Sequence, residues 1–340
     1  MAAVSLAILA GTLALAMVLE ARARARAATA GYRPLDIPRV DAHQHAGPAT
    51  VGAAMSLDAT QGVQSLVNAS GGWMGDGLLE QLAAAARFPG RVAVLMELDF
   101  RGCCGPDWVD REVVRLVQGR AAGARGLHVS GALGRTVRDE RGRRVPADTA
   151  ALEPIWDIVR RLELPVILHA AVSAEGGPAL PFDEHVRLVD RHPDIPFVGG
   201  GFAGHAGDPA EVSRLLDRLP NLRVDTAGVL RELARHPAAT REAIVTHPDR
   251  VLFGTDLKWI EGPGDRKAVL FPSEGPREPR AFYEGTWRLL ETPGPVPPAL
   301  ASPGSDTALE GLALPRDVLE NVYHRNAERL FGLSPAEDLR

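Results

Sequence analysis

The feature of this chain that most restricts its fold is a series of eight short apolar runs of β-type composition, most of them separated by segments with helical spacing. The runs cover residues 37–42, 62–68, 91–98, 124–129, 165–170, 196–202, 222–227 and 251–256. Between them, apolar residues recur three and four positions apart, as on the faces of amphipathic helices. A strand followed by a helix, repeated eight times, predicts an α/β protein whose parallel strands close into a (β/α)8 TIM-like barrel.

Length and charge agree with one barrel that has no nucleic-acid partner. The chain has 340 residues, and such barrels commonly need roughly 250 as a single unit. Its net charge of −5 offers no basic field for nucleic acid, so we expect no nucleic-acid partner. The two cysteines, Cys103 and Cys104, are adjacent, and we expect them to be poorly placed to bridge each other and to supply no disulfide framework.

The N-terminal residues differ in composition from the rest of the chain. Residues 2–19 are almost continuously apolar, and the arginines follow the apolar run instead of preceding it as in a secretory signal. Eighteen residues are marginal for a membrane span. By the positive-inside rule, the arginines after the run would hold the following domain in the cytoplasm. The small residues among and after these arginines could instead form the cleavage site of a signal peptidase. We therefore predict a signal-like or anchor-like segment at 1–30 and one domain at 31–340, either membrane-associated or exported. Cytoplasmic location and a misassigned start site are the alternatives.

Three of the apolar runs lead into residues that can bind a metal. RVDAHQH (39–45), LPVILHAA (164–171) and RVLFGTDL (250–257) place His43, His45, His169 and Asp256 at predicted strand ends. Two His separated by one residue project from the same side of a strand, so both can reach one ion. Three imidazoles and a carboxylate suit Zn²⁺ or a similar divalent ion and leave room for water. The pattern predicts a mononuclear metal site at the carboxyl ends of the strands.

The region after the eighth run departs from the strand and helix repeat. Residues 258–315 are rich in Pro and Gly, with one expected helix near 279–291. In a barrel this segment follows the eighth strand, so we predict a lid or substrate-shaping insertion over the active-site face. A final helix is expected at 315–331, packed on the outside of the barrel.

These segments, with NLRVDTAG (221–228) and YHRNAERLFG (323–332), resemble the amidohydrolase superfamily over roughly residues 36–335. Within that superfamily, the chain resembles the amidohydrolase-related branch, which includes metal-dependent hydrolases, lactonases, hydratases and nonoxidative decarboxylases. It implies a distorted barrel with one divalent ion, usually Zn²⁺, with Mn²⁺ or another ion as alternatives. The implied metal ligands are His43, His45, His169 and Asp256.

The chain departs from the family pattern at the sixth strand. There the family typically has a His that orients or deprotonates the metal-bound water, whereas Gly201 occupies that place here and His205 lies four residues later. Either the glycine-rich loop brings His205 back to the site, or the site lacks this base. On the fourth strand His128 stands where some relatives carry a modified Lys that bridges two metals. His128 is expected either to act on the substrate or its protons, or to be a core imidazole.

The resemblance favours a hydrolase that directs a metal-activated water at a small-molecule amide, lactone or ester carbonyl. Asp256 would be both a ligand and the proton shuttle, with His205 and His128 as further catalytic candidates. One alternative is a nonoxidative decarboxylase or hydratase of a carboxylated, often aromatic, substrate. Another is a metal-binding homologue with little or no catalysis. A homodimer is a further expectation. Candidates for gripping the substrate are Arg135, Arg138, Lys258, Trp259 and Arg288.

Overall fold

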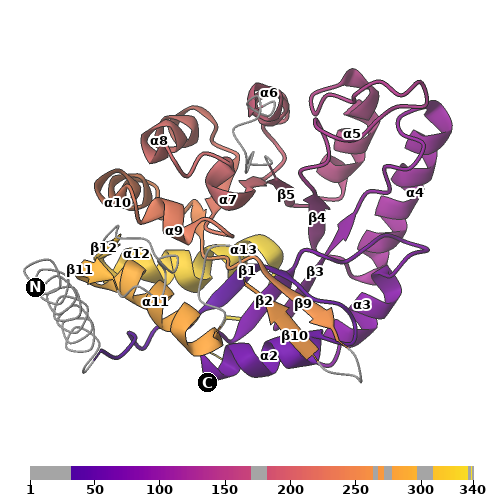
Figure 1. Cartoon of the computed structure of the whole chain (residues 1–340). Coiled ribbons are helices and arrows are strands. Elements are labelled where there is room, and N and C mark those ends of the chain that lie inside the picture. The colour runs from indigo at the N-terminus through magenta and orange to yellow at the C-terminus, as the bar shows by residue number, and fades with distance from the viewer. Residues whose placement is uncertain are drawn as a thin grey trace, which may run out of the picture.

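The structure is a computed structural model, and it describes residues 32–169, 182–262, 267–271, 278–296, 309–335 and 338. All eight predicted strands are present, and neighbours in the sequence are parallel neighbours in one curled sheet (Figure 1). They are β1 (Val40–His45), β2 (Ser65–Asn68), β3 (Val92–Glu97), β4 (Gly126–Val129), β5 (Val166–His169), β6 (Phe197–Gly199), β7 (Leu222–Asp225) and β8 (Val251–Leu252). The prediction of an α/β barrel with parallel strands is confirmed.

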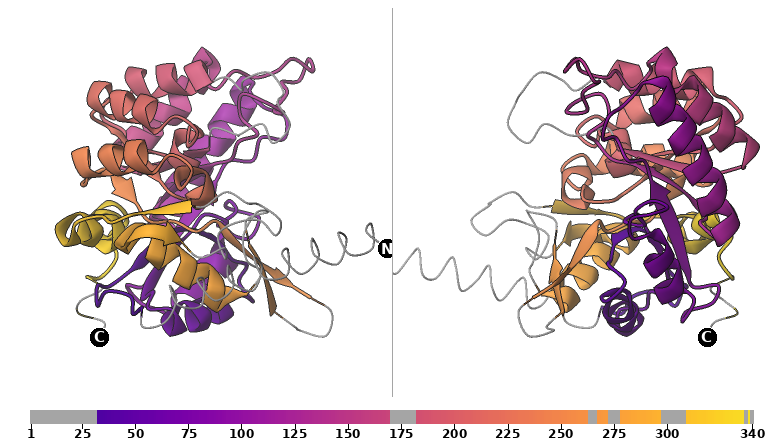
Figure 2. Two further views of the ribbon diagram at one scale, coloured as in Figure 1. Left: turned by 60° about the vertical axis from the view of Figure 1, so that its left-hand side comes forward. Right: turned by 90° about the vertical axis from the view of Figure 1, so that its right-hand side faces the viewer.

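Helices connect the strands and cover the outside of the sheet (Figure 2). They are α2 (Val51–Thr60), α3 (Leu78–Ala85), α4 (Pro106–Ala122), η1 (Ala150–Leu152), α5 (Glu153–Arg161), α6 (Phe182–Arg191), α7 (Gly200–Ala203), α8 (Pro209–Arg218), α9 (Leu230–Leu233) and α10 (Pro237–Thr246). Helix α8 shows how the sequence sets a boundary, because Asp208 accepts a hydrogen bond from the Glu211 N–H and proline occupies the first turn. Large side chains such as Trp108, Trp156 and Phe197 fill the layer between sheet and helices.

The ring closes through the segment after β8. The N–H of Ala42 donates to the Phe253 carbonyl at 2.8 Å, and the N–H of Asp256 donates to the His43 carbonyl at 2.9 Å. The chain then continues as β9 (Leu257–Glu261), which runs parallel to β1. Because this connection spans residues 253–256, it draws Asp256 to the carboxyl end of β1.

The interior of the barrel has its own apolar cluster. Six of the eight barrel strands contribute one or two side chains to it: Val40, Ala42, Val67, Ala93, Leu95, Ile167, Val198 and Leu252. The C-terminal helices α12 (Arg316–Glu320), η4 (Asn321–Arg325) and α13 (Asn326–Phe331) follow one another without a break, and Ala327 and Phe331 join this inner cluster. The final helix was therefore predicted correctly, but its expected position outside the barrel was wrong. It covers the amino-terminal end of an apolar lumen that would otherwise meet water.

The region after β9 contains two hairpins and a helix. Strand β10 (Lys267–Leu270) pairs antiparallel with β9, and β11 (Pro293–Val296) pairs antiparallel with β12 (Leu309–Leu312). The first hairpin projects from the body of the barrel in the left-hand view of Figure 2. Helix α11 (Pro279–Glu291) matches the predicted helix and packs outside the barrel, with its Trp287 ring 5.0 Å from Phe253. The other parts of the predicted lid, 263–266, 272–277 and 297–308, lie outside the described residues, and the lid stays a prediction.

Two further expectations concern the N-terminus and the cysteines. Residues 1–31, which carry the predicted signal or anchor, lie outside the described residues, and among those described no helix has the length and apolarity to cross a membrane. Cys103 and Cys104 are adjacent, with their sulfur atoms in contact and their Cα atoms 3.1 Å apart. As neighbours in the chain they supply no link between distant parts of it, as expected.

Candidate metal centre

The alternation of side chains along each strand explains which residues reach the barrel mouth. On β5, Ile167 belongs to the inner cluster, so His169, two residues later, faces the same lumen. On β3, Leu95 is an inner residue, and Glu97 follows it by the same step. The inner face of the sheet is therefore apolar at its base and changes to titratable side chains at the carboxyl ends of the strands.

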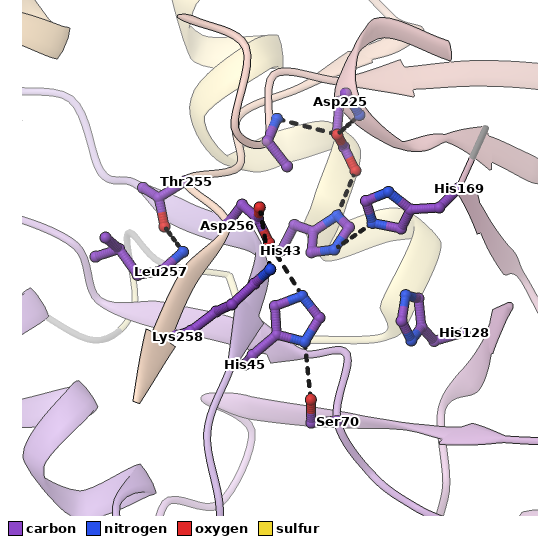
Figure 3. A network of polar contacts seen from close by, with 12 residues as sticks. His43, His45, Ser70, His128, His169, Asp225, Thr255, Asp256, Leu257 and Lys258 are labelled. Carbon is purple, nitrogen blue, oxygen red and sulfur yellow. Dashed lines mark hydrogen bonds and ion pairs between the residues drawn. The ribbon is translucent and has the colours of Figure 1, made fainter. Parts of the chain in front are cut away.

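Strand β1 needs an irregularity to achieve this change. Val40 and Ala42 belong to the inner cluster, yet simple alternation from them would turn His43 outward. The pairing of β1 with β2 shifts between Asp41 and Gln44. A bulge of this kind re-aims the side chains that follow it. As a result His43 and His45 turn towards the other imidazoles, as Figure 3 shows, whereas Gln44 donates outward to Asp58 on α2.

The predicted ligands converge at this mouth (Figure 3). The Nε2 atoms of His43 and His169 are 3.0 Å apart, and His45 Nε2 lies 3.1 Å from Asp256 Oδ1. Donor atoms of His43, His45 and Asp256 all lie within 4.8 Å of one another, and so do those of His43, His128 and His169. Two overlapping sets of donors that share His43 can therefore surround one ion.

Backbone features let these side chains approach each other. Asp256 has a φ of 61°, in the left-handed region that few residues other than glycine, Asn and Asp adopt, and that marks a functional position more often than a structural one. A Cβ at Gly200 would lie 3.1 Å from the His169 ring. A Cβ at Gly254 would lie 2.9 Å from the Cβ of His43. These glycines therefore leave the space that the two imidazoles occupy.

A carboxylate behind His43 sets its orientation. Asp225 lies at the end of β7, and its Oδ2 atom is 2.7 Å from His43 Nδ1; both side chains are fully buried. Its other oxygen accepts the N–H groups of Gly201 and Ala227 at 2.8 and 3.0 Å. Because an ionised carboxylate only accepts, the neutral imidazole carries its proton on Nδ1 and directs the Nε2 lone pair at the mouth. His45 is held in a similar way, with its Nδ1 2.8 Å from the Ser70 hydroxyl.

The charge states suit a divalent cation. Burial lowers the pKa of His169 well below its usual value and also lowers the pKa of His45. Burial opposes a charge on His43 too, but the charge and hydrogen bond of Asp225 outweigh it and raise its pKa. For Asp256, burial would raise the pKa, yet His45, His43 and Lys258 together lower it. At neutral pH the mouth therefore offers an ionised carboxylate and imidazoles of low or carboxylate-supported basicity, which are the ligands that Zn²⁺ prefers.

Comparisons with known proteins agree with this geometry. The amidohydrolase family profile matches residues 40–333 of the chain. The chain belongs to the amidohydrolase family. It is an enzyme of the amidohydrolase type, and the resemblance read from the sequence is confirmed. A search of curated protein sequences finds no match.

Solved structures show the same fold for this amidohydrolase. A 2,6-dihydroxybenzoate decarboxylase from Rhizobium is 16% identical, with a TM-score of 0.54 over 87% of this chain and 99% of that one. A putative 2-pyrone-4,6-dicarboxylic acid hydrolase from Pseudomonas putida is 15% identical, with a TM-score of 0.53 over 88% and 99%. A 4-oxalomesaconate hydratase from Rhodopseudomonas palustris is 14% identical, with a TM-score of 0.53 over 88% and 97%. At these identities the likeness concerns the fold.

A buried polar network on the outer side of β1 supports the amidohydrolase mouth from behind. Asp41 accepts the N–H and hydroxyl of Thr255 at 3.0 and 2.5 Å, so it ties β1 to the segment that carries Asp256. Gln44 donates to both Asp41 and Asp58, and Asp58 accepts the Tyr283 hydroxyl of α11 at 2.7 Å. Burial raises the pKa of Asp41 to about 6, and burial with the nearby charge of Asp41 raises that of Asp58 to about 8.

The other predicted catalytic residues lie in different places. His128, at β4, joins the cluster, with its ring centroid 5.4 to 5.9 Å from those of His169, His45 and His43. His205 stacks on Phe182 of α6 with a centroid separation of 3.8 Å, and no described contact joins it to the cluster. The glycine-rich segment does turn sharply, with positive φ at Gly201, but the turn directs His205 to the helix layer.

The predicted substrate residues are also dispersed. The half-exposed Lys258 places its Nζ 3.8 Å from Asp256 Oδ2, and it is the member of this group nearest the mouth. Trp259 donates to Gln44 at 3.3 Å, so it faces α2. Arg288 is buried on α11 against Glu284 and the Tyr32 ring, because that helix packs outside the barrel. Arg135 and Arg138 are exposed in the loop after β4, and Arg138 lines a cleft of about 510 Å³ with Trp73 and Arg101.

Two residues of the site were missed by reasoning from the sequence. Asp225 lies within the segment 221–228 that carries the family resemblance, yet no role followed from its position alone. Glu97 ends β3, two residues after the inner Leu95, and its Oε1 lies 3.3 Å from His128 Nδ1. Alternation from the inner Leu95 would have identified Glu97, whereas β7 places no residue in the inner cluster from which Asp225 could be counted.

Proposed function

We propose that this amidohydrolase is a metal-dependent hydrolase that directs a metal-activated water at the carbonyl of a small-molecule amide, lactone or ester. One divalent ion, Zn²⁺ before Mn²⁺, would be held by His43, His45, His169 and Asp256. The observation that carries the proposal is the convergence of these four side chains from three distant parts of the chain. Their donor atoms approach to 3.0 and 3.1 Å in two pairs.

The donor set fits such an ion. His128 Nε2 is buried and accepts no hydrogen bond from any described residue, and Asp256 Oδ1 has the His45 Nε2 atom 3.1 Å away. Buried polar atoms are normally paired, so an imidazole nitrogen left with a free lone pair in this cluster is available to a cation. Catalytic zinc sites combine about three protein ligands with an open water position, and imidazole and carboxylate are typical ligands.

The residues of the chain have separable roles in this proposal. A bound ion would supply an acidified water and polarise the substrate carbonyl. Asp256 would accept the proton of the attacking water and deliver it to the leaving group. Lys258, whose Nζ is 3.8 Å from Oδ2, favours the ionised form of Asp256 before that transfer. Asp225 would hold His43 in the tautomer that presents Nε2.

A second candidate uses the same residues for a different reaction. A nonoxidative decarboxylase or a hydratase of a carboxylated, often aromatic, substrate would bind the same ion. The similar folds of a decarboxylase and a hydratase favour it as much as the hydrolase. In the cleft that Arg138 lines with Trp73 and Arg101, Arg138 offers a cation for such a substrate, whereas Arg101 is paired with Asp99 and covers the Trp73 ring.

A third candidate is a metal-binding homologue with weak or no catalysis. The observation in its favour is Gly201, which stands where the family has a sixth-strand His and donates its N–H to Asp225. His205 stacks on Phe182 instead. Because the sixth strand supplies no imidazole, Asp256 or His128 must accept the proton of the attacking water. If neither does, turnover is low.

Substrate panels distinguish the three candidates. The Zn²⁺-loaded full chain is assayed with lactones, amides and esters by acid release, and with hydroxybenzoates and unsaturated carboxylic acids by CO₂ release and water addition. Hydrolysis that disappears in Asp256→Asn supports the proposal. CO₂ release or hydration that disappears in the same variant supports the second candidate instead. Full metal content without turnover on any panel supports the third.

The predictions of cellular location and oligomeric state rest on the sequence alone. A small-molecule substrate fits the family. Membrane association through residues 2–19, export, and a homodimer remain predictions. Gel filtration of the full chain with fractionation of expressing cells would test them.

A further inference from the structure

We propose that Glu97 and His128 form a second carboxylate and imidazole pair that adds a ligand from β4 to the metal centre. This inference rests on the proposed function, because it concerns the same ion. Glu97 is a positioning residue in this account, since it acts through His128. The four-ligand pattern inferred from the family resemblance contains neither residue.

The two residues are set opposite each other by the sheet. Glu97 and His128 are direct partners in the parallel pairing of β3 with β4, and both stand at the carboxyl ends of their strands. Oε1 of Glu97 lies 3.3 Å from His128 Nδ1, and Oε2 lies 3.2 Å from the N–H of Gly72 that donates to it. The carboxylate is thus held at one oxygen by the backbone after β2 and directs the other at the imidazole.

This contact determines which nitrogen of His128 faces the mouth. An ionised carboxylate has no proton to donate, so the hydrogen between the two groups belongs to Nδ1. Nε2 then carries a lone pair. It is buried, and no described residue donates a hydrogen bond to it. A side chain that is 5% exposed and held with an acceptor free inside a cluster of imidazoles has the arrangement of a metal ligand.

The position of the ring agrees. One nitrogen from each of His43, His128 and His169 lies within 4.8 Å of the others. The three rings meet edge to face, at interplanar angles of 77° to 85°. The three rings are therefore close enough for each to offer one nitrogen to a single ion.

The same construction occurs on the opposite side of the barrel. Asp225 on β7 supports His43 on β1 through Nδ1, as Glu97 on β3 supports His128 on β4. In each pair the carboxylate lies behind the imidazole, and the other nitrogen points to the mouth. Carboxylates in this position orient metal-bound His and raise its basicity. The repetition of the arrangement is the reason to assign His128 to the ion and not to the substrate alone.

The test measures metal binding and does not depend on activity. Zn²⁺ affinity of the full chain is determined by competition with a chelating dye, and the visible spectrum is recorded with Co²⁺. We expect His128→Ala and Glu97→Leu each to weaken Zn²⁺ binding by about 10- to 100-fold and to shift the Co²⁺ bands in the same direction. Glu97→Gln offers a single oxygen to the Gly72 N–H and to His128 Nδ1 and carries no charge, so it should also weaken Zn²⁺ binding and shift the Co²⁺ bands in that direction.

Controls separate this inference from the proposed function. His247→Ala removes a buried imidazole that bonds to Ser213, away from the mouth, and should leave both readouts unchanged. If His43→Ala abolishes binding while the His128 and Glu97 variants bind as the parent does, the fifth ligand is refuted and the proposed centre stands. If His43→Ala also binds normally, both are refuted. Should Glu97→Leu not fold, His128→Gln with Glu97→Gln decides the question through the same bands.

Discussion

The two ends of this barrel are built from the same strands but differ in chemistry. At the amino end, Val40, Ile167 and Leu252 meet Phe331 of the C-terminal helix in a closed apolar cluster. At the carboxyl end, one or two steps along the same strands, the inner side chains are imidazoles and carboxylates with atoms that no described residue satisfies. Stability is concentrated at the first end and the capacity to bind at the second, as is typical of barrels of this type.

The difference shows how a fold can tolerate a costly site. Unpaired buried donors and acceptors destabilise by about 1–3 kcal/mol each, and clustered charges add to this. The inner apolar cluster at the amino end, which forms the floor of the barrel, holds the mouth in place despite that cost, together with the outer helices and the buried network of Asp41, Asp58 and Tyr283. Substitutions at the mouth should therefore change function with little loss of stability, and those at the floor should do the reverse.

The largest effect is expected at Asp256. Asp256→Asn removes the charge but keeps a residue that tolerates the observed φ of 61°, so the backbone should not change. Activity on whichever substrate class is turned over should fall at least about 10³-fold, because both a ligand and the proton shuttle are lost. The free energy of unfolding of the metal-free protein should stay within about 0.5 kcal/mol of the parent. Steady-state kinetics and urea unfolding measure the two quantities. Near-normal turnover would remove Asp256 from the mechanism.

The floor should respond in the opposite way. Phe331→Ala deletes a ring that is 2% exposed in the inner cluster and should cost about 3–5 kcal/mol of unfolding free energy, while the folded variant binds Zn²⁺ as the parent does. The matched control is Leu79→Ala, at a leucine that is 54% exposed, which should change stability by less than about 0.5 kcal/mol. Equal costs for the two variants would mean that α13 does not close the barrel.

A smaller effect is expected behind the ligands. Asp225→Asn retains an oxygen for the Gly201 and Ala227 N–H groups but removes the charge beside His43. Zn²⁺ affinity should fall by about 10- to 100-fold, measured by chelator competition. Ser70→Ala, which removes the neutral partner of His45, should weaken binding less. The reverse order would contradict the role given to the carboxylate.

The smallest effect is a pH dependence of stability. The pKa of Asp58 is about 8 in the folded protein, mainly because of burial, and its ordinary value is 3.8. The folded state therefore holds this proton more tightly, so the stabilisation is fully present below about pH 4 and is lost as the pH rises towards 8. The slope from one group cannot exceed about 1.4 kcal/mol per pH unit. Urea unfolding of metal-free Asp58→Asn between pH 5 and 8 should show a flatter profile than the parent, and parallel profiles would show that Asp58 is ionised.

Much of the fold could be predicted from the sequence because its signals are local. Apolar runs and helical spacing determine strands and helices one at a time, and parallel order follows from their alternation. The position of the final helix could not be predicted in this way. Its apolar residues would fit either an outer groove or the inner end of the barrel, and only the inner cluster with Phe331 decides between them.

The residues of the candidate site also differ in how far the sequence alone predicts them. His43, His45, His169 and Asp256 stand out because imidazole and carboxylate are typical zinc ligands and stand here at predicted strand ends. Glu97 and Asp225 do not stand out, since their role depends on the imidazole that each one faces on another strand. His205 could not be placed from the sequence, because three glycines allow the turn to go either way and the structure turns it towards Phe182.

The central claim is that side chains from β1, β5 and the segment after β8 enclose one cation at the barrel mouth. Metal analysis of the purified full chain, beside His43→Ala and the distant His247→Ala, tests it most directly. The account predicts about one equivalent of a divalent metal in the parent and in His247→Ala, and almost none in His43→Ala. Metal retained in full by His43→Ala would contradict it.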